Sequence, residues 1–283
     1  MKTVLVSVVT VLLSGASTFA ADLYQPVEAA APIIEQPEAV VETSGWYLRG
    51  DVGYSFNKLR GAHFYQGSNG YRRDFDKADV DNSYTIGGGV GYQANRYLRA
   101  DLTVDYLGKS DFRGATTGSC GVDPFACTSR DRASFSGWSV LANAYVDLGT
   151  YYSITPYVGA GLGGTRISWS NLKNTSCSDA DPTNCDPTMT HKGKDSWRFT
   201  YAVMAGAAVD VTCNLKADVG YRYRRVLGGD MFGYKAHGGP GSDKGFNLHE
   251  VRAGLRYSFG GCPEEAYVAP PVVDYPVEQP VYK

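Results

Sequence analysis

The chain of 283 residues carries 27 lysines and arginines against 29 aspartates and glutamates, which gives a formal net charge of −2. This near-neutral balance gives no reason to expect a nucleic-acid partner. After the first twenty residues no apolar run is long enough for a transmembrane helix, so an ordinary helical membrane protein is excluded. A β-barrel is not excluded, because its strands are apolar at only every second position.

The amino terminus has the character of a secretory signal peptide. Lys2 precedes an apolar run over residues 4–13, and Thr18-Phe19-Ala20 is similar to a cleavage site. Cleavage after Ala20 would release a mature chain that begins at Ala21. We therefore assign residues 1–20 to export into an oxidising compartment, where the six cysteines can pair.

Two proline-rich segments flank one folded domain. Residues 21–44 carry prolines and acidic side chains without periodicity, and residues 261–283 have the same character, so both are expected to be extended tails. Residues 45–260 between them have the size of a single ordinary domain.

Eight segments of this domain alternate between apolar and polar side chains. In the clearest, residues 97–107, Leu98 and Leu102 alternate with Arg99 and Asp101. Successive side chains of a strand point to opposite faces, so this pattern predicts strands with one apolar and one charged face. The eight segments are 46–56, 83–93, 97–107, 135–148, 154–169, 198–211, 215–225 and 246–259.

The connections between these segments alternate in length. Short connections lie around residues 94–95, 149–153 and 212–214, and long ones over 57–80, 108–133, 170–197 and 227–247. This asymmetry is typical of outer-membrane barrels, whose short turns face the periplasm and whose long loops face outside. We predict an all-β, eight-stranded antiparallel transmembrane β-barrel in a Gram-negative outer membrane, surrounded by lipid and lipopolysaccharide, with both Pro-rich tails in the periplasm.

The charged faces are expected to fill the barrel. Eight strands leave room only for the barrel's own side chains, and buried ions are costly unless they are paired. We therefore predict a closed network of ion pairs that is structural and does not conduct ions. Its expected members are Arg49, Asp51, Arg99, Asp101, Asp105, Lys216, Asp218, Arg222, Glu250, Arg252 and Arg256, with Asp147, Asp210 and Arg224 on the same faces.

The predicted topology also brings the cysteines together in pairs. Two pairs each lie within one long loop, and the last pair joins the final short turn to the end of the final strand. Metal binding by thiolates is the alternative, but the spacings do not match zinc sites, and we expect no metal or cofactor. The expected disulfides are Cys120–Cys127, Cys177–Cys185 and Cys213–Cys262.

No catalytic group emerges from the remaining residues, and we predict that the protein is not an enzyme. His63, His191 and His237 fall in expected loops, and His249 begins the last strand on its apolar face, where a membrane-interface role is expected. Basic loop residues suit the phosphates of lipopolysaccharide or a host glycan, although neighbouring aspartates offset them. These residues are Arg72, Arg73, Lys77, Lys192 and Lys194.

The closing stretch "HEVRAGLRYSF" and the earlier "GYRYRRVLGGDMFG" resemble small alphaproteobacterial outer-membrane surface antigens of the rhizobial type, within the porin-family and OmpA-like barrels. The resemblance covers residues 46–259. It implies that Gly254, Tyr257 and Phe259 belong to the strand that the barrel-assembly machinery recognises. Phe259 is followed here by a tail, which departs from the usual terminal aromatic residue.

The resemblance also implies a link to the cell wall. Related chains that open with Ala-Asp and a Pro/acid-rich stretch are joined to peptidoglycan through that end, which points to Ala21 and Asp22. An extended linker over residues 21–44 would reach about 70 Å; a plain spacer is the alternative. We expect a structural protein that supports the envelope and displays its loops, with an adhesin and a narrow porin as the alternatives.

Overall fold

The computed structural model describes residues 44–66, 70–234 and 238–259. In these ranges the alternating segments form antiparallel strands, and the strands number fifteen where eight were expected. Within the same ranges, no helix has the length and apolarity that a membrane span requires.

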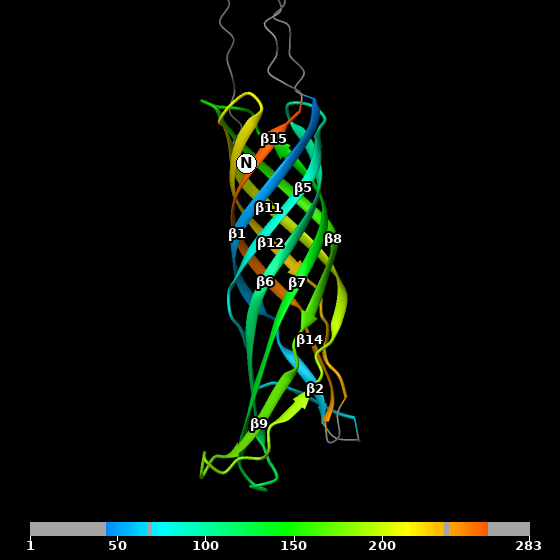
Figure 1. The fold of residues 1–283 in the computed structure, drawn as a ribbon, viewed down its shortest axis with the longest axis vertical. Helices are drawn as coiled ribbons and strands as arrows, with labels where there is room; N and C mark the ends of the chain where they lie inside the picture. The colour runs from blue at the N-terminus through cyan, green and yellow to red at the C-terminus, as the bar shows by residue number, and fades with distance from the viewer. Residues whose placement is uncertain (1–43, 67–69, 235–237, 260–283) are drawn as a thin grey trace, which may run out of the picture. The chain divides into compact units, whose positions relative to one another are not determined.

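Eight of the strands pair side by side in a closed ring, which we call the ring (Figure 1). The first and last of them are in antiparallel register from Tyr47 opposite Ser258 to Leu59 opposite Phe246. Closure leaves no ring strand with a free edge. In pairing order the ring strands are β7 (Cys127–Asp147), β8 (Ile154–Trp169), β11 (Asp195–Asp210), β12 (Leu215–Val226), β15 (Phe246–Ser258), β1 (Gly45–Leu59), β5 (Ser83–Gln93) and β6 (Leu98–Gly118), which pairs again with β7.

Tight turns connect neighbouring strands at one end of the ring. Backbone hydrogen bonds run from Ala94 to Leu98, between Tyr151 and Ile154, and from Val211 to Leu215. The beginning of β1 and the end of β15 lie at this same end, because the Phe259 amide donates to Trp46 and the Ser258 amide donates to the 212–214 turn. Figure 1 shows the start of β1 at the end of the ring opposite to β2, β9 and β14.

The four long connections were expected to be loops, and that expectation was wrong for much of their length. Strands β6 and β7 each run for 21 residues and stay paired beyond the ring, with a register shift between Leu107 and Ser110. Strand β4 pairs with β6, β9 pairs with β7 and β10 pairs with β9, while β13, β14, β2 and β3 form a second sheet. The bounds are β2 (Ala62–Gln66), β3 (Tyr71–Asp74), β4 (Lys77–Val80), β9 (Leu172–Ser178), β10 (Met189–His191), β13 (Gly229–Phe232) and β14 (Gly238–Asp243).

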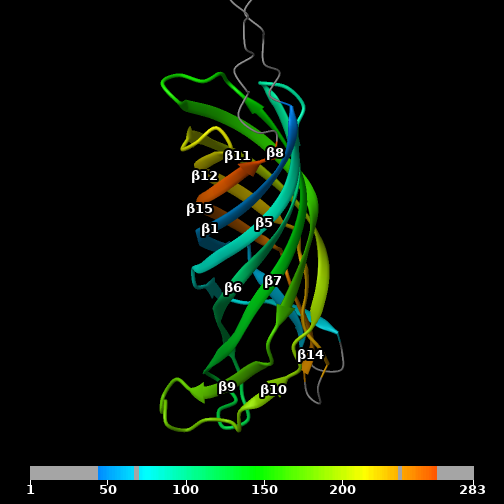
Figure 2. The same ribbon diagram turned by 45° about the horizontal axis from the view of Figure 1, so that its top comes forward.

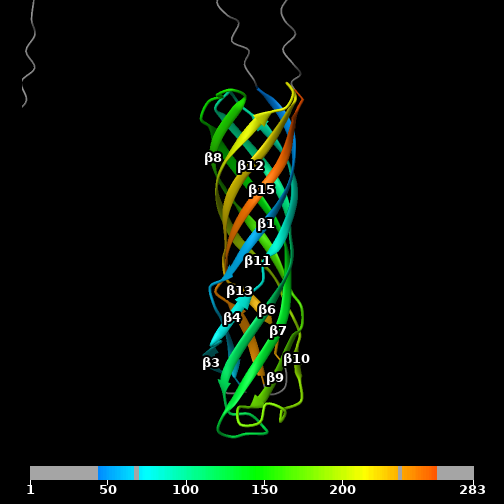
Figure 3. The ribbon, with the colours of Figure 1, turned by 90° about the vertical axis from the view of Figure 1, so that its left-hand side faces the viewer.

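We call these seven strands, residues 110–135 and the described residues that connect these strands to one another and to the ring the head. Figures 2 and 3 show β9 and β10 beyond the ring at the same end as the extended parts of β6 and β7. The sequence hid these strands because their outward side chains, such as Lys109, Asp111 and Arg113, are as polar as those of a surface loop. Their apolar side chains point inward instead.

The side-chain pattern inverts where the ring meets the head. In the ring the outward residues are apolar: Leu102 and Val219 are exposed and Val140 is half-buried, on the face that would contact lipid. From Leu107 onward the inward row of β6 carries no charged side chain, and Phe112 of this row belongs to an aromatic core. In this core the ring centroids of Phe135 and Phe246 lie 4.6 Å apart, and Phe112 meets Trp169 edge-on at 5.7 Å. Its buried members are Leu59, Ala62, Leu107, Phe112, Phe135, Ile167, Trp169, Leu172, Val226, Met231, Phe232, Phe246 and Leu248.

Candidate functional site

The interior of the ring is filled with charged side chains from the faces that the alternation predicted to be polar. Of the eleven network residues expected from the sequence, Lys216 alone is not buried. The buried ten are Arg49, Asp51, Arg99, Asp101, Asp105, Asp218, Arg222, Glu250, Arg252 and Arg256. They fall into separate groups whose partners come from strands far apart in the sequence.

The group nearest to the aromatic core contains two arginines and two carboxylates. Arg222 Nη1 lies 2.9 Å from Asp105 Oδ2, and Arg222 Nε also contacts Glu250 Oε2. Arg224 pairs with the same two carboxylates, at 2.7 Å to Asp105 and 3.1 Å to Glu250. All four side chains are at most 2% exposed. The group is therefore neutral and closed, which is how buried ions become tolerable.

A second group spans β1, β6 and β15. Arg49 lies 2.8 Å from Asp51 and 3.0 Å from Asp101, and Arg252 lies 2.8 Å from the other oxygen of Asp51. Tyr145 accepts a hydrogen bond from Arg49 at 3.0 Å. Two cations and two anions again balance, and the tyrosine joins the group because its phenol shares the polar face of β7.

Three more predicted members lie toward the turn end of the ring. Arg99 pairs with Asp147 at 3.0 Å and stacks on Tyr145, with its guanidinium 3.9 Å from the ring centroid. Asp218 accepts a hydrogen bond of 2.5 Å from Tyr157, a partner that the sequence did not suggest. Arg256 lies over the ring of Tyr47 at 5.4 Å and has no ion pair within the described residues. The inward tyrosines thus complete the network.

Lys216 differs from the rest of the network because it is partly open to solvent. It lies 2.5 Å from Asp210, with the two side chains 30% and 33% exposed. This pair joins the ends of β11 and β12 beside the 212–214 turn.

Glycine makes the dense filling possible at the positions where the network approaches the backbone. A Cβ atom added at Gly254 would lie 2.4 Å from Asp51 Oδ1, and one at Gly87 would lie 2.2 Å from Asp105 Oδ1. Gly254 of the predicted assembly strand therefore has a structural reason to be glycine. The other two residues predicted there, Tyr257 and Phe259, are exposed on the apolar face with ring centroids 5.5 Å apart.

Two local disulfides stiffen the head. Cys120 is bonded to Cys127, and Cys177 is bonded to Cys185. Cys213 is also disulfide-bonded, and its expected partner Cys262 lies outside the described residues. The amino-terminal residues Ala21 and Asp22 and the histidine His237 lie outside them as well.

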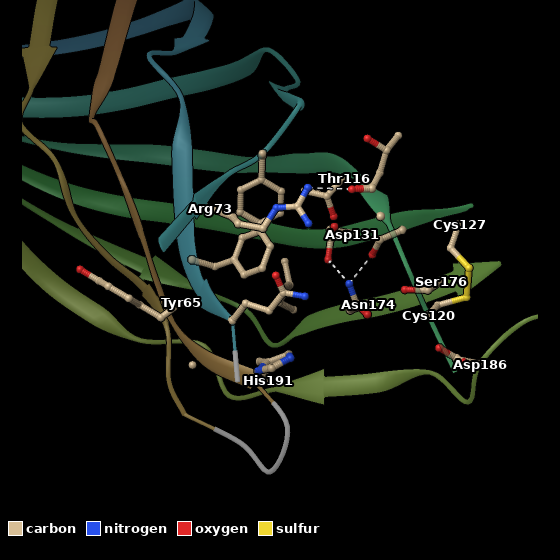
Figure 4. Close-up of a pocket in the computed structure, with 18 of the residues that line it drawn as sticks. Tyr65, Arg73, Thr116, Cys120, Cys127, Asp131, Asn174, Ser176, Asp186 and His191 are labelled. Atoms are coloured by element: carbon tan, nitrogen blue, oxygen red, sulfur yellow. Dashed lines mark hydrogen bonds between the residues drawn. A yellow bond between two sulfur atoms is a disulfide. The ribbon is translucent and has the colours of Figure 1, made fainter. Parts of the chain in front are cut away.

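The head also contains a pocket of about 220 Å³ that the sequence did not reveal (Figure 4). One wall is aromatic, with Phe64, Phe75 and Phe232, and the other is polar, with Asp131, Asn174 and Ser176. The aromatic wall comes from β2, β13 and the connection between β3 and β4, and the polar wall comes from β7 and β9. An aromatic wall opposite carboxylate and amide groups suits a small polar molecule with one apolar face, such as a sugar ring.

Asp131 is the most unusual group in this pocket. It is 2% exposed, its Oδ1 accepts a hydrogen bond of 2.7 Å from Asn174, and its Oδ2 has no partner among the described residues. Burial raises the pKa of Asp131, although the Asn174 and Ser129 side chains oppose the shift. His191, expected in a loop, is buried across the pocket with its ring 5.3 Å from that of Phe232.

The other two described histidines, His63 and His249, are half-buried. His63 is part of β2 and meets Tyr65 edge-on at 6.1 Å. His249 lies between Tyr221 and Tyr223, with its Nδ1 2.5 Å from the Tyr221 hydroxyl, on the outward face where an interface role was expected. Among the described residues, no group of three His, Cys, Asp or Glu side chains could hold a metal ion.

Known proteins are similar to this sequence over most of its length. The family model described as the outer membrane protein beta-barrel domain matches residues 27–259. An uncharacterized protein of Brucella abortus strain 2308 is 40% identical over 246 residues, which cover 76% of this chain and 85% of that protein. A protein of Rickettsia bellii strain RML369-C with the name "Putative adhesin" is 26% identical over 226 residues, which cover 75% of this chain and 87% of that protein.

Solved structures of other proteins also align with most of this chain. The crystal structure of Neisserial surface protein A aligns with a TM-score of 0.41 and 21% identity, covering 76% of this chain and 99% of that one. The family match confirms the resemblance to Gram-negative outer-membrane barrels that the closing strand suggested. With the match spanning the whole ring and head, the chain belongs to the outer membrane protein β-barrel domain family.

Proposed function

We propose that the protein is a sealed outer-membrane barrel that holds its head at the cell surface for contact with molecules outside, in the manner of an adhesin. The observation that carries this proposal is the closed interior of the ring. If the lumen passes nothing, the part of the molecule left to act is the head.

Among the described residues, buried ion pairs and an apolar layer lie in the interior. Asp105, Glu250 and their two arginines cross the lumen as a neutral group with almost no exposed surface. The aromatic core of Phe112, Phe135, Trp169 and Phe246 lies directly beyond it. A permeant ion would have to break buried ion pairs and then cross an apolar layer, both of which are costly. A narrow porin is therefore the least favoured of the three functions.

The head is built as a rigid surface for contact. Two disulfides, two packed sheets and a shared aromatic core fix its shape. Exposed aromatic side chains, including Tyr71, Phe125 and Tyr234, are of the kind that anchor protein and glycan contacts. The pocket beside Asp131 can receive one small polar group of a larger ligand. The Rickettsia relative with an adhesin name supports the same role.

The test is surface attachment by cells that carry either the full protein or a variant without the long extension. Replacing residues 112–133 by a short Gly-Ser turn shortens β6 and β7 but leaves their ring pairing from Leu107 inward unchanged. We expect attachment to host cells or glycan-coated surfaces to be lost while the heat-modifiable folded band keeps its level. Full attachment by the shortened variant would refute the proposal.

Support of the envelope through a peptidoglycan tether is a second candidate. It is favoured by one observation, that β1 begins at the end of the ring with the tight turns, where the linker would emerge into the periplasm. Mass spectrometry of muropeptides after lysozyme digestion would detect a link at Ala21. A free Ala21 amine in all of the recovered protein would exclude it.

A further inference from the structure

Three positively charged side chains lie directly opposite one another on adjacent strands of the head. Arg113 of β6 pairs in register with Arg132 of β7, and Arg132 pairs with Lys173 of β9. All three are exposed on the same outward face. We call this set the basic row. Like charges directly opposite in a sheet are destabilising, so such an arrangement calls for a compensating partner.

The protein itself compensates little of this charge. Arg113 lies 2.6 Å from Asp81. Arg132 and Lys173 form no ion pair with any residue in 44–66, 70–234 or 238–259, and neither does Arg130, two positions further along the same face of β7. Among the other surface cations of the head, Arg72 and Lys244 pair with Asp74 and Lys194 pairs with Asp230, whereas Arg73 and Lys77 form no ion pair with a described residue.

The basic row lies in a groove. A hollow of about 450 Å³ is lined by all three cations together with Ser134, Ser170 and Asn171. Its one acidic residue, Asp111, lies 3.6 Å from Lys109. Guanidinium, ammonium and hydroxyl groups all donate hydrogen bonds to phosphate oxygens. The groove therefore has the chemistry of a phosphate site.

The position of the groove indicates where the phosphate comes from. On the outward face of β7, Arg132 follows the same row as Trp138, whose ring lies 5.0 Å from that of Tyr106 in an aromatic pair typical of a membrane interface. Six residues at about 3.3 Å each, on a strand tilted by about 45°, place Arg132 roughly 14 Å beyond this pair. That height is above the acyl chains, and the exposed row of β7 that carries Arg132 continues into the lipid-facing row of the ring.

We infer that the basic row binds the phosphate groups of lipopolysaccharide molecules packed beside the barrel. The inference rests on the proposed orientation, with the head outside, because lipopolysaccharide occupies that leaflet. A soluble polyanion is disfavoured, because the outward face of β7 that carries Arg132 continues directly into the lipid-facing row of the ring. Bound in this way, lipopolysaccharide would neutralise the opposed cations and fix the base of the head to the membrane surface.

The test compares lipopolysaccharide binding by the full-length protein, refolded in detergent, with that of two matched variants. Arg132→Gln/Lys173→Gln removes two charges from the basic row, and the control Arg60→Gln/Lys244→Gln removes two exposed charges that do not line the groove. The probes are labelled rough lipopolysaccharide and the same lipopolysaccharide after removal of its phosphates. Each exposed contact changes affinity about two- to fivefold, so the basic-row variant should lose about tenfold and the control less than twofold.

Several outcomes would overturn the inference. They are equal binding of the phosphorylated and dephosphorylated probes, equal losses in both variants, and displacement of the probe by heparin at equal charge concentration. The single variant Arg132→Gln is a control for a folding defect in the double variant. It should lose about half as much affinity on a logarithmic scale. Because the assay uses purified protein, it does not depend on attachment, and a strain with the basic-row variant should still attach if the head is an adhesin.

Discussion

The barrel should lose far more stability when one charge of its buried ion-pair group is neutralised than when a surface charge is changed. This group consists of Arg222, Arg224, Asp105 and Glu250. Glu250→Gln keeps the size of the side chain but removes a charge that contacts both arginines. The group then holds two cations and one anion with no access to water, since its side chains are at most 2% exposed. Breaking such a buried pair costs about 3–5 kcal/mol.

The same chain supplies a matched control and a partial rescue. Asp210→Asn breaks the Lys216 pair, whose side chains are 30% and 33% exposed, and should cost less than about 1 kcal/mol. Adding Arg222→Gln to Glu250→Gln leaves Arg224 and Asp105 as a neutral pair, so the double variant should cost less than Glu250→Gln alone.

Urea unfolding of protein refolded into lipid vesicles measures these differences, through tryptophan fluorescence and the folded band in unheated gels. The expected order of stability is wild type, Asp210→Asn, the double variant and then Glu250→Gln. A Glu250→Gln variant within about 1 kcal/mol of the Asp210→Asn variant would refute the reasoning, because the larger cost requires a dry, closed interior.

Three further predictions follow from the packing and the head. Gly163→Ala would place a Cβ 2.0 Å from a backbone oxygen of β7 and should cost about 1–3 kcal/mol in the same urea assay, whereas Gly50→Ala, with nothing within 4 Å, should change stability little. Replacing Cys177 and Cys185 by serine removes a disulfide worth about 2.5 kcal/mol; limited proteolysis should then cut the head while the ring stays intact. Burial raises the pKa of Asp131, so the protonated side chain stabilises the head at a pH below the ordinary aspartate pKa. This stability is lost as the pH rises through the raised pKa, and proteolysis of the head should then become faster. Asp131→Asn should remove this pH dependence.

The alternation of side chains was sufficient to predict the strands of the ring. Lipid on one side and a charged lumen on the other enforce a strict period of two, so Leu98 and Leu102 point outward while Arg99 and Asp101 point inward. The same alternation identified the types of residue in the network. It could not identify the partners, because a pair such as Arg222 with Asp105 joins residues 117 positions apart through the closure of the ring.

The head could not be predicted because its strands have water on the outside, so their exposed side chains resemble those of loops. Phe112 belongs to the aromatic core, but the register shift after Leu107 interrupts the pattern that would have marked it as part of a strand. The pocket depends on the pairing of β7 with β9, which brings Asp131 opposite Asn174. Local sequence carries no sign of that contact. Cysteines within one connection were easier, since the closeness in sequence of Cys120 and Cys127 limits the choice of partner.

Conductance across planar lipid bilayers tests most directly whether the interior is sealed. With wild-type protein inserted at neutral pH, we expect no steady current steps, because the neutral ion-pair groups and the aromatic core around Phe112 close the lumen. Stable ohmic steps that scale with the amount of folded protein would contradict the account and would return the molecule to the class of narrow porins.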